Sequence, residues 1–87
     1  MVRLPLSPAQ VEAGRRLGRR IRAARGDREL TEVAHGAGIS PETLRKIESG
    51  RLPSPAFGTV VGLAETLMIP LTELAEAYRT EQVAESA

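Results

Sequence analysis

Three Ser-Pro pairs punctuate the chain and restrict it to short helical segments. The pairs are Ser7-Pro8, Ser40-Pro41 and Ser54-Pro55. Serine is a favoured N-cap and proline suits the first helical position, so each pair predicts the start of a helix. Gly26, Gly38 and Gly50 each follow a helical pattern, and glycine is common just beyond a helix end. Start and stop signals therefore predict a succession of helices.

The spacing of apolar residues agrees with these signals. Apolar residues recur three and four positions apart, and no segment alternates with a period of two for long. We expect helices at about 8–25, 28–36, 41–49, 55–67 and 71–84, the last one starting after Pro70. The predicted fold class is all-α, a compact five-helix bundle. The 87 residues suit one domain spanning 1–87, with its core at about 8–84 and loose ends.

Two further expectations concern packing. Phe57 and Met68 are expected to fill the core. Gly14 and Gly18 lie four residues apart in the first helix, as Gly58 and Gly62 do in the fourth. Glycine costs about 1 kcal/mol relative to alanine inside a helix. We therefore expect these glycines to allow a close approach of the first and fourth helices.

Composition excludes several classes of function. There is no cysteine, and His35 and Asp27 are the single residues of their kinds, so neither a metal site, a cofactor nor an enzyme is expected. No apolar run approaches the roughly 18 residues of a membrane span, and the arginine-rich start does not resemble a signal peptide. We expect a cytoplasmic protein that does not contact a membrane.

Charge is divided unevenly along the chain. Residues 1–51 carry eleven basic and six acidic residues, a net charge of +5, whereas residues 52–87 carry one and five, a net charge of −4. The basic half is mostly arginine, which suits phosphate, although a solvated helix face has the same composition. The arginines of the first helix cannot all face one side. We expect two or three to reach a phosphate backbone and the rest to be solvated.

The most informative segment runs from Leu30 to Gly50. Small Ala34, Gly38 at a reversal of the chain, Ile39 at the junction and the anchors Leu44 and Ile47 predict two short helices around a tight turn at about 28–50. This spacing leaves polar residues of the second helix facing outward. A helix of this kind can enter a DNA major groove and reach base edges.

These residues, with Ser40, Glu48 and Gly50, resemble the helix-turn-helix of lambda-repressor/Cro-like (Xre-family) transcriptional regulators. Leu17-Gly18 with Ile21-Arg22, and Leu63-Ala64 with Leu67, resemble the flanking helices of that family. The resemblance covers about residues 15–78. It implies base reading by Pro41, Glu42, Thr43, Arg45 and Lys46. It implies contacts with the DNA backbone by Ser40, Arg51 and Ser54.

The family also implies an ion pair between Glu48 and Arg25, and the sequence departs from the family in three places. Leu30 replaces a glutamine that braces the DNA backbone, and Pro41 replaces a polar reader. The link from Arg25 to Ala34 is about two residues shorter than usual.

We expect a sequence-specific DNA-binding regulator, a repressor, that binds double-stranded DNA as a homodimer. Tyr78 and Leu74 of the acidic last helix are the expected dimer surface. Two alternatives stay open. One is the antitoxin of a toxin-antitoxin pair, and the other is an interaction module that has lost DNA binding and has an unidentified protein partner.

Overall fold

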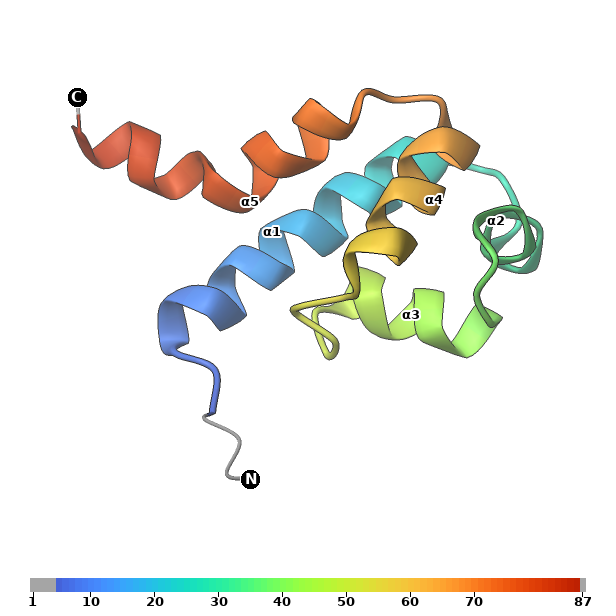
Figure 1. Ribbon diagram of the computed structural model, residues 1–87, viewed down its shortest axis with the longest axis horizontal. Coiled ribbons are helices and arrows are strands. Elements are labelled where there is room, and N and C mark those ends of the chain that lie inside the picture. Colours follow the sequence, from blue (N-terminus) through green and yellow to red (C-terminus); the bar gives the residue numbers. More distant parts are fainter. Residues whose placement is uncertain (1–4, 87) are drawn as a thin grey trace.

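The computed structural model of the protein contains five α-helices in the residues it describes (Figure 1). It describes the backbone of residues 5–86 and the side chains of residues 5–79. They are α1 (Pro8–Arg25), α2 (Leu30–Ala37), α3 (Pro41–Ser49), α4 (Phe57–Leu67) and α5 (Leu71–Ser86). No strand occurs among the described residues, so the all-α class is confirmed. Residues 1–4 and 87, parts of the ends expected to be loose, lie outside the described residues.

Two of the three Ser-Pro pairs begin helices as predicted. Ser7 caps α1 in a reciprocal capping box with Gln10, and Ser40 caps α3. The start predicted at Ser54-Pro55 is wrong, because α4 begins at Phe57. The preceding Pro53 lies against the backbone of Gly14 in α1, so the chain is still crossing between helices at this point.

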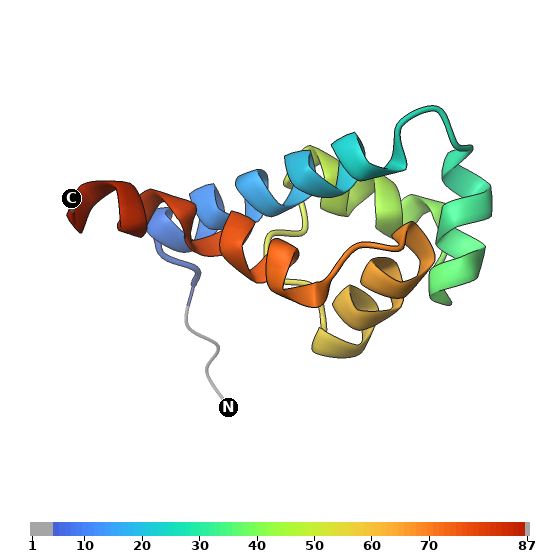
Figure 2. The same cartoon turned by 90° about the horizontal axis from the view of Figure 1, so that it is seen from above.

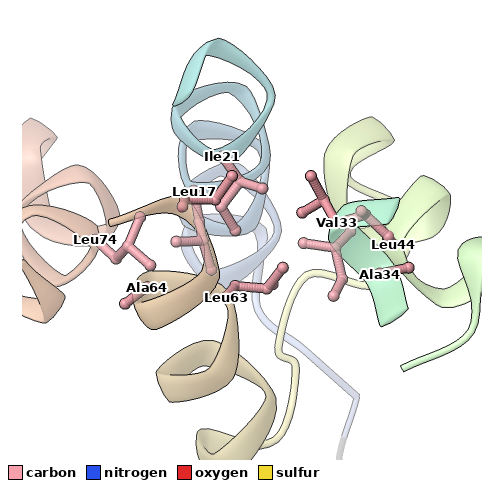
Figure 3. Packing of buried hydrophobic residues seen from close by; sticks show 10 residues of the cluster. Leu17, Ile21, Val33, Ala34, Leu44, Leu63, Ala64 and Leu74 are labelled. Atoms are coloured by element: carbon pink, nitrogen blue, oxygen red, sulfur yellow. The ribbon is translucent and has the colours of Figure 1, made fainter. Parts of the chain in front are cut away.

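The core is aliphatic and takes side chains from all five helices (Figure 3). Leu17 and Ile21 of α1 lie between Leu74 of α5 on one side and Val33 of α2 on the other. Other buried members are Ala34, Leu44, Ile47, Leu63, Ala64 and Leu67. Burying aliphatic side chains of this size contributes about 1.5–3 kcal/mol each. This shared core is what fixes α3 against the rest of the molecule.

Phe57 and Met68 are not core residues, so that expectation is wrong. Their exposed fractions are 72% and 86%. Phe57 is the first residue of α4, and Met68 directly follows the last, with a φ of 60°. Both therefore lie at the ends of the helix, beyond the part that packs on the core.

The glycines expected to join α1 to α4 instead serve other contacts. A Cβ added to Gly18 would lie 2.3 Å from the carbonyl oxygen of Ile47 in α3, and one added to Gly62 would lie 2.8 Å from that of Ala37 in α2. Gly58 has nothing within 4 Å. The cause is the arrangement of the helices, since α1 lies between α3 and α5 and α4 packs on α2 (Figures 1 and 2).

Candidate nucleic-acid interface

Helix α3 is held firmly at both ends. At its start the Ser40 hydroxyl oxygen accepts a hydrogen bond from the backbone N–H of Thr43 at 3.1 Å, and the two hydroxyl oxygens lie 2.9 Å apart. Gly38 precedes the helix with a φ of 77°, and Gly50 follows it with a φ of 85°. Both values favour glycine. The hydroxyls of Ser40 and Thr43 are thus engaged in the cap.

The turn between α2 and α3 brings these helices into close contact. Ala34 and Leu44 are fully buried at the contact, and Ile39 packs partly buried against the core. The backbone N–H of Ile39 donates to the carbonyl of Ala34 at 3.0 Å, which closes the end of α2. With Gly38 in the left-handed region, this is a helix-C-terminal turn that leads directly into the next helix.

The outward side of α3 carries charged side chains. Glu42, Arg45 and Lys46 are exposed, whereas Pro41 and Thr43 are half-buried. None of the three charged side chains makes a hydrogen bond or ion pair within the described part of the chain. They are therefore available to a ligand, and the helix that presents them is anchored from behind by Leu44 and Ile47.

The expected ion pair between Arg25 and Glu48 is present. It is bidentate, with 2.7 Å between Arg25 Nε and Glu48 Oε2 and 2.9 Å between Arg25 Nη2 and Glu48 Oε1. The side chains are only 13% and 7% exposed. The hydrogen bonds to Glu48 raise the pKa of Arg25, against partial burial that lowers it. The pair joins the end of α1 to α3.

The short link between α1 and α2 is built around the same arginine. Gly26 follows α1 with a φ of 57° and a ψ of −127°, a conformation that suits glycine. Arg25 Nη1 then donates to the carbonyl of Arg28 at 2.8 Å, and Arg28 Nη1 donates to the carbonyl of Thr66 in α4 at 3.0 Å. Guanidinium hydrogen bonds thus hold this short link, together with a backbone turn in which the N–H of Arg28 donates to the carbonyl of Arg25 at 3.0 Å.

Leu30, the first residue of α2, offers no side-chain donor. Leu30 is partly buried and packs against the core. Glu29 precedes it as the N-cap without a side-chain cap hydrogen bond. The phosphate contact that the family makes with a glutamine side chain at this position therefore has no counterpart in Leu30.

The segment between α3 and α4 presents polar groups beside α3. Arg51 and Ser54 are exposed, and the backbone N–H of Leu52 donates to the carbonyl of Lys46 at 3.0 Å. Ala56, the N-cap of α4, has no side-chain acceptor for the first N–H groups of that helix. Unoccupied N–H groups at a helix start favour an anion such as phosphate.

The sequence profile of the helix-turn-helix domain matches residues 12–77, from the first turns of α1 into α5. The chain belongs to the helix-turn-helix domain family. This match covers more than half of the chain and confirms the regulator family expected from the residues. No curated protein matches the chain significantly.

In this helix-turn-helix protein, sequence reasoning missed an apolar groove between α4 and α5. It has a volume of about 390 Å³ and is lined by Phe57, Leu71, Tyr78 and Arg79 among others. Phe57 and Tyr78 are the single phenylalanine and the single tyrosine of the chain. Phe57 was expected in the core and Tyr78 on a dimer surface. Only the position of Phe57 at the first turn of α4 could have signalled its exposure.

The groove includes both residues of the expected dimer surface. Leu74 is 1% exposed and belongs to the core, and it also lines the groove. Tyr78 is half-buried at the groove.

The described residues contain no group of three or more histidine or acidic side chains that could hold a metal ion. No single described helix is long and apolar enough to cross a membrane. Helix α4 and Leu71–Arg79 together have the length and apolar composition of a membrane span, but they are bent by 120° relative to each other. Both helices bury leucines of this pair in the protein core.

Proposed function

We propose that the protein is a sequence-specific DNA-binding transcriptional repressor of the cytoplasm that reads a major groove with α3. The observation that carries the proposal is the outward side of α3. It presents three charged side chains without partners among the described residues, on a helix fixed by its cap and its core anchors. Membership of the helix-turn-helix domain family supports the proposal, because helices of this motif bind in the DNA major groove. The proposed function is binding and involves no catalytic step.

The residues of α3 suit distinct base edges. Arg45 and Lys46 can donate to guanine O6 and N7, and Glu42 can accept from cytosine N4. Thr43 has its hydroxyl engaged in the cap, so its contribution is the methyl group, which suits the methyl of thymine. Pro41 offers an apolar contact.

Contacts with phosphate supply most of the affinity and fix the register. Arg51 is exposed just beyond α3, and Ser54 is exposed before the uncapped start of α4. The hydroxyl of Ser40 is engaged in the cap, so Ser40 contributes to phosphate binding by fixing the start of α3. The exposed positive charge at Arg51 and the start of α4 thus follow the C-terminal end of the reading helix, and the start of α3 lies at its other end.

One domain of this size reads few base pairs, so we propose a homodimer on a two-fold site. The groove between α4 and α5 is the surface that fits a second copy. It exposes Phe57 and Leu71, and it includes Ser54 and Pro55 of the segment beside α3. A copy seated there would lie next to the DNA-facing loop, as a dimer on adjacent half-sites requires.

Substitutions in α3 and in the segment that follows α3 test the proposal. Lys46→Ala is expected to reduce discrimination at one base position by about 1–3 kcal/mol. Arg51→Gln is expected to weaken binding to all duplexes about equally. Arg19→Gln, on an exposed arginine of α1, is the charge-matched control. The base preference is measured on a duplex site obtained by selection from a random library. If every variant of α3 keeps the base preference of the wild-type protein, base reading by this helix is contradicted.

The groove is also the observation that favours a protein partner, whether a toxin or another protein. An interaction module would bind through Phe57 and Leu71, with affinity that changes little with salt, whereas phosphate binding weakens steeply. Co-purification of a small toxin-like protein would favour the antitoxin alternative. Affinity for DNA that falls as salt rises distinguishes the repressor from the module.

A further inference from the structure

Apart from Arg25, the arginines of α1 fall into two groups. Arg16 donates from Nε to the carbonyl of Ala77 at 3.2 Å and from Nη2 to that of Tyr78 at 2.8 Å. Arg20 pairs with Glu73 at 2.6 Å. These two arginines tie α1 to α5. The expectation that the arginines that do not reach phosphate are solvated is therefore wrong for Arg16 and Arg20. The exposed arginines of the helix are Arg15, Arg19 and Arg22.

The exposed arginines differ in their direction around the helix. Gly18 marks the direction of α3, because its backbone lies against Ile47. At about 100° per residue, Arg15 and Arg22 point within about 60° of that direction. Arg19 points about 100° away from it. Arg15 and Arg22 therefore border α3, and Arg19 does not.

Arg15 lies beside the end of α3, and the helix geometry of α1 places Arg22 on the same side. A Cβ on Gly50 would lie 2.8 Å from Cγ of Arg15, so the Arg15 side chain covers the residue that precedes Arg51. Arg22 lies one turn before Arg25, whose guanidinium binds Glu48 in the last turn of α3. The acidic partner of this face is Glu12, 3.5 Å from Arg15, and both side chains are about half exposed. A surface pair of this kind is weak.

We propose that Arg15 and Arg22 form a second phosphate-binding surface that continues from Arg51 along α1. This surface holds the DNA backbone flanking the bases that α3 reads. Figures 1 and 2 show α1 packed against α3, with α5 on the opposite side of α1, so no helix described in the structure covers this face. The proposal rests on the proposed DNA-binding function and names two of its contacts.

The test measures how the affinity of the protein for DNA depends on salt concentration. The duplex contains a half-site obtained by selection from a random library. Each contact with a phosphate contributes about 0.9 to the slope of log affinity against log salt. Arg15→Gln and Arg22→Gln should each reduce the slope by about 1, and the double variant by about 2. Arg19→Gln removes the same charge from the same helix and should leave the slope unchanged. Arg15→Lys and Arg22→Lys should retain it.

The length of the duplex provides a second readout. Removing the flanking base pairs at one end of the half-site should abolish the difference between the wild-type protein and the double variant. Removing them at the other end should preserve that difference. Equal melting temperatures of the proteins check that folding is unchanged.

The outcomes separate this inference from the function on which it rests. If the wild-type protein binds DNA but both glutamine variants keep its slope, or Arg19→Gln lowers the slope equally, the phosphate surface on α1 is wrong. If the wild-type protein binds no duplex even at low salt, the proposed function itself fails.

Discussion

Arg25 connects the end of α1 with the link to α2 and with the distant α3. Its guanidinium binds both carboxylate oxygens of Glu48 and the carbonyl of Arg28, and Arg28 in turn reaches Thr66. A planar guanidinium can do this because its donors point in fixed directions. One side chain thereby sets the end of α1, the link to α2 and the position of α3.

Glu48→Ala is predicted to lower the free energy of unfolding by about 3 kcal/mol, because removing one partner leaves a mostly buried charge without compensation. Urea denaturation measures the change. Glu12→Ala, which breaks an exposed pair, is the control and should change stability by less than about 1 kcal/mol. Equal effects of the two variants would contradict the role assigned to the buried pair.

The pH dependence of this pair follows from the raised pKa of Arg25. A raised pKa means that folding favours the charged guanidinium. The stabilising contribution of Arg25 is therefore fully present below the pKa that Arg25 has in the unfolded chain. It disappears only as pH rises through the higher pKa that Arg25 has in the folded protein. Between pH 7 and 9 the difference in stability between Glu48→Gln and the wild-type protein should stay constant, as urea denaturation can show. A difference that shrinks over this range would contradict the assignment.

Sequence reasoning succeeded for residues that obey a local rule or a family pattern. The pairing of Arg25 with Glu48 is one such case. It failed for Phe57 and Met68, since periodicity identifies the apolar side of a helix but not where that side passes the edge of the core. The hydrogen bonds that build the link depend on Thr66, which is remote in sequence and gave no signal.

Among the elements, α1 packs against α3 on one side and α5 on the other. Its side near α3 uses glycine to bring two backbones together, and its side near α5 uses arginine donors. The starts of α1 and α3 were predicted well because serine and proline act within one turn, whereas the start of α4, capped by Ala56, was not. The partners of the glycines were predicted wrongly, because spacing within a helix does not show which helix lies opposite.

A matched pair of substitutions tests the close contact of α1 with α3. Gly18→Ala should destabilise the protein by about 1–3 kcal/mol, since the added Cβ would collide with backbone oxygens of α3. Gly58→Ala, in open space on α4, should stabilise it by about 0.5–1 kcal/mol through helix propensity. Thermal and urea denaturation both report the difference. Stabilisation by Gly18→Ala would show that the two helices do not approach so closely.

At the scale of the whole molecule, two surfaces have different chemistry. The side formed by α1, α3 and the segment after α3 carries Arg15, Arg22, Arg45, Lys46 and Arg51. The groove between α4 and α5 is apolar and holds both aromatic residues. An aliphatic core with aromatic residues at the surface is consistent with a groove that a partner covers.

Phe57→Ser is predicted to weaken self-association at least tenfold and to leave the fold intact, because a 72% exposed aromatic side chain contributes little to the core. Sedimentation of the protein with and without the operator measures this effect. Met68→Ser, on an exposed residue that does not line the groove, is the control. A wild-type protein that remains monomeric at high concentration and on DNA would contradict the dimer.

The central claim is that α3 reads a DNA sequence, and selection of bound duplexes from a random library at near-physiological salt tests it most directly. The account predicts enrichment of a two-fold-symmetric site whose half-sites lie about one helical turn, or 34 Å, apart. Each base position of the half-site can then be matched to Glu42, Thr43, Arg45 or Lys46 by substitution. An enriched asymmetric half-site would retain DNA reading and remove the dimer. No enriched sequence, with no binding even at low salt, would contradict the claim.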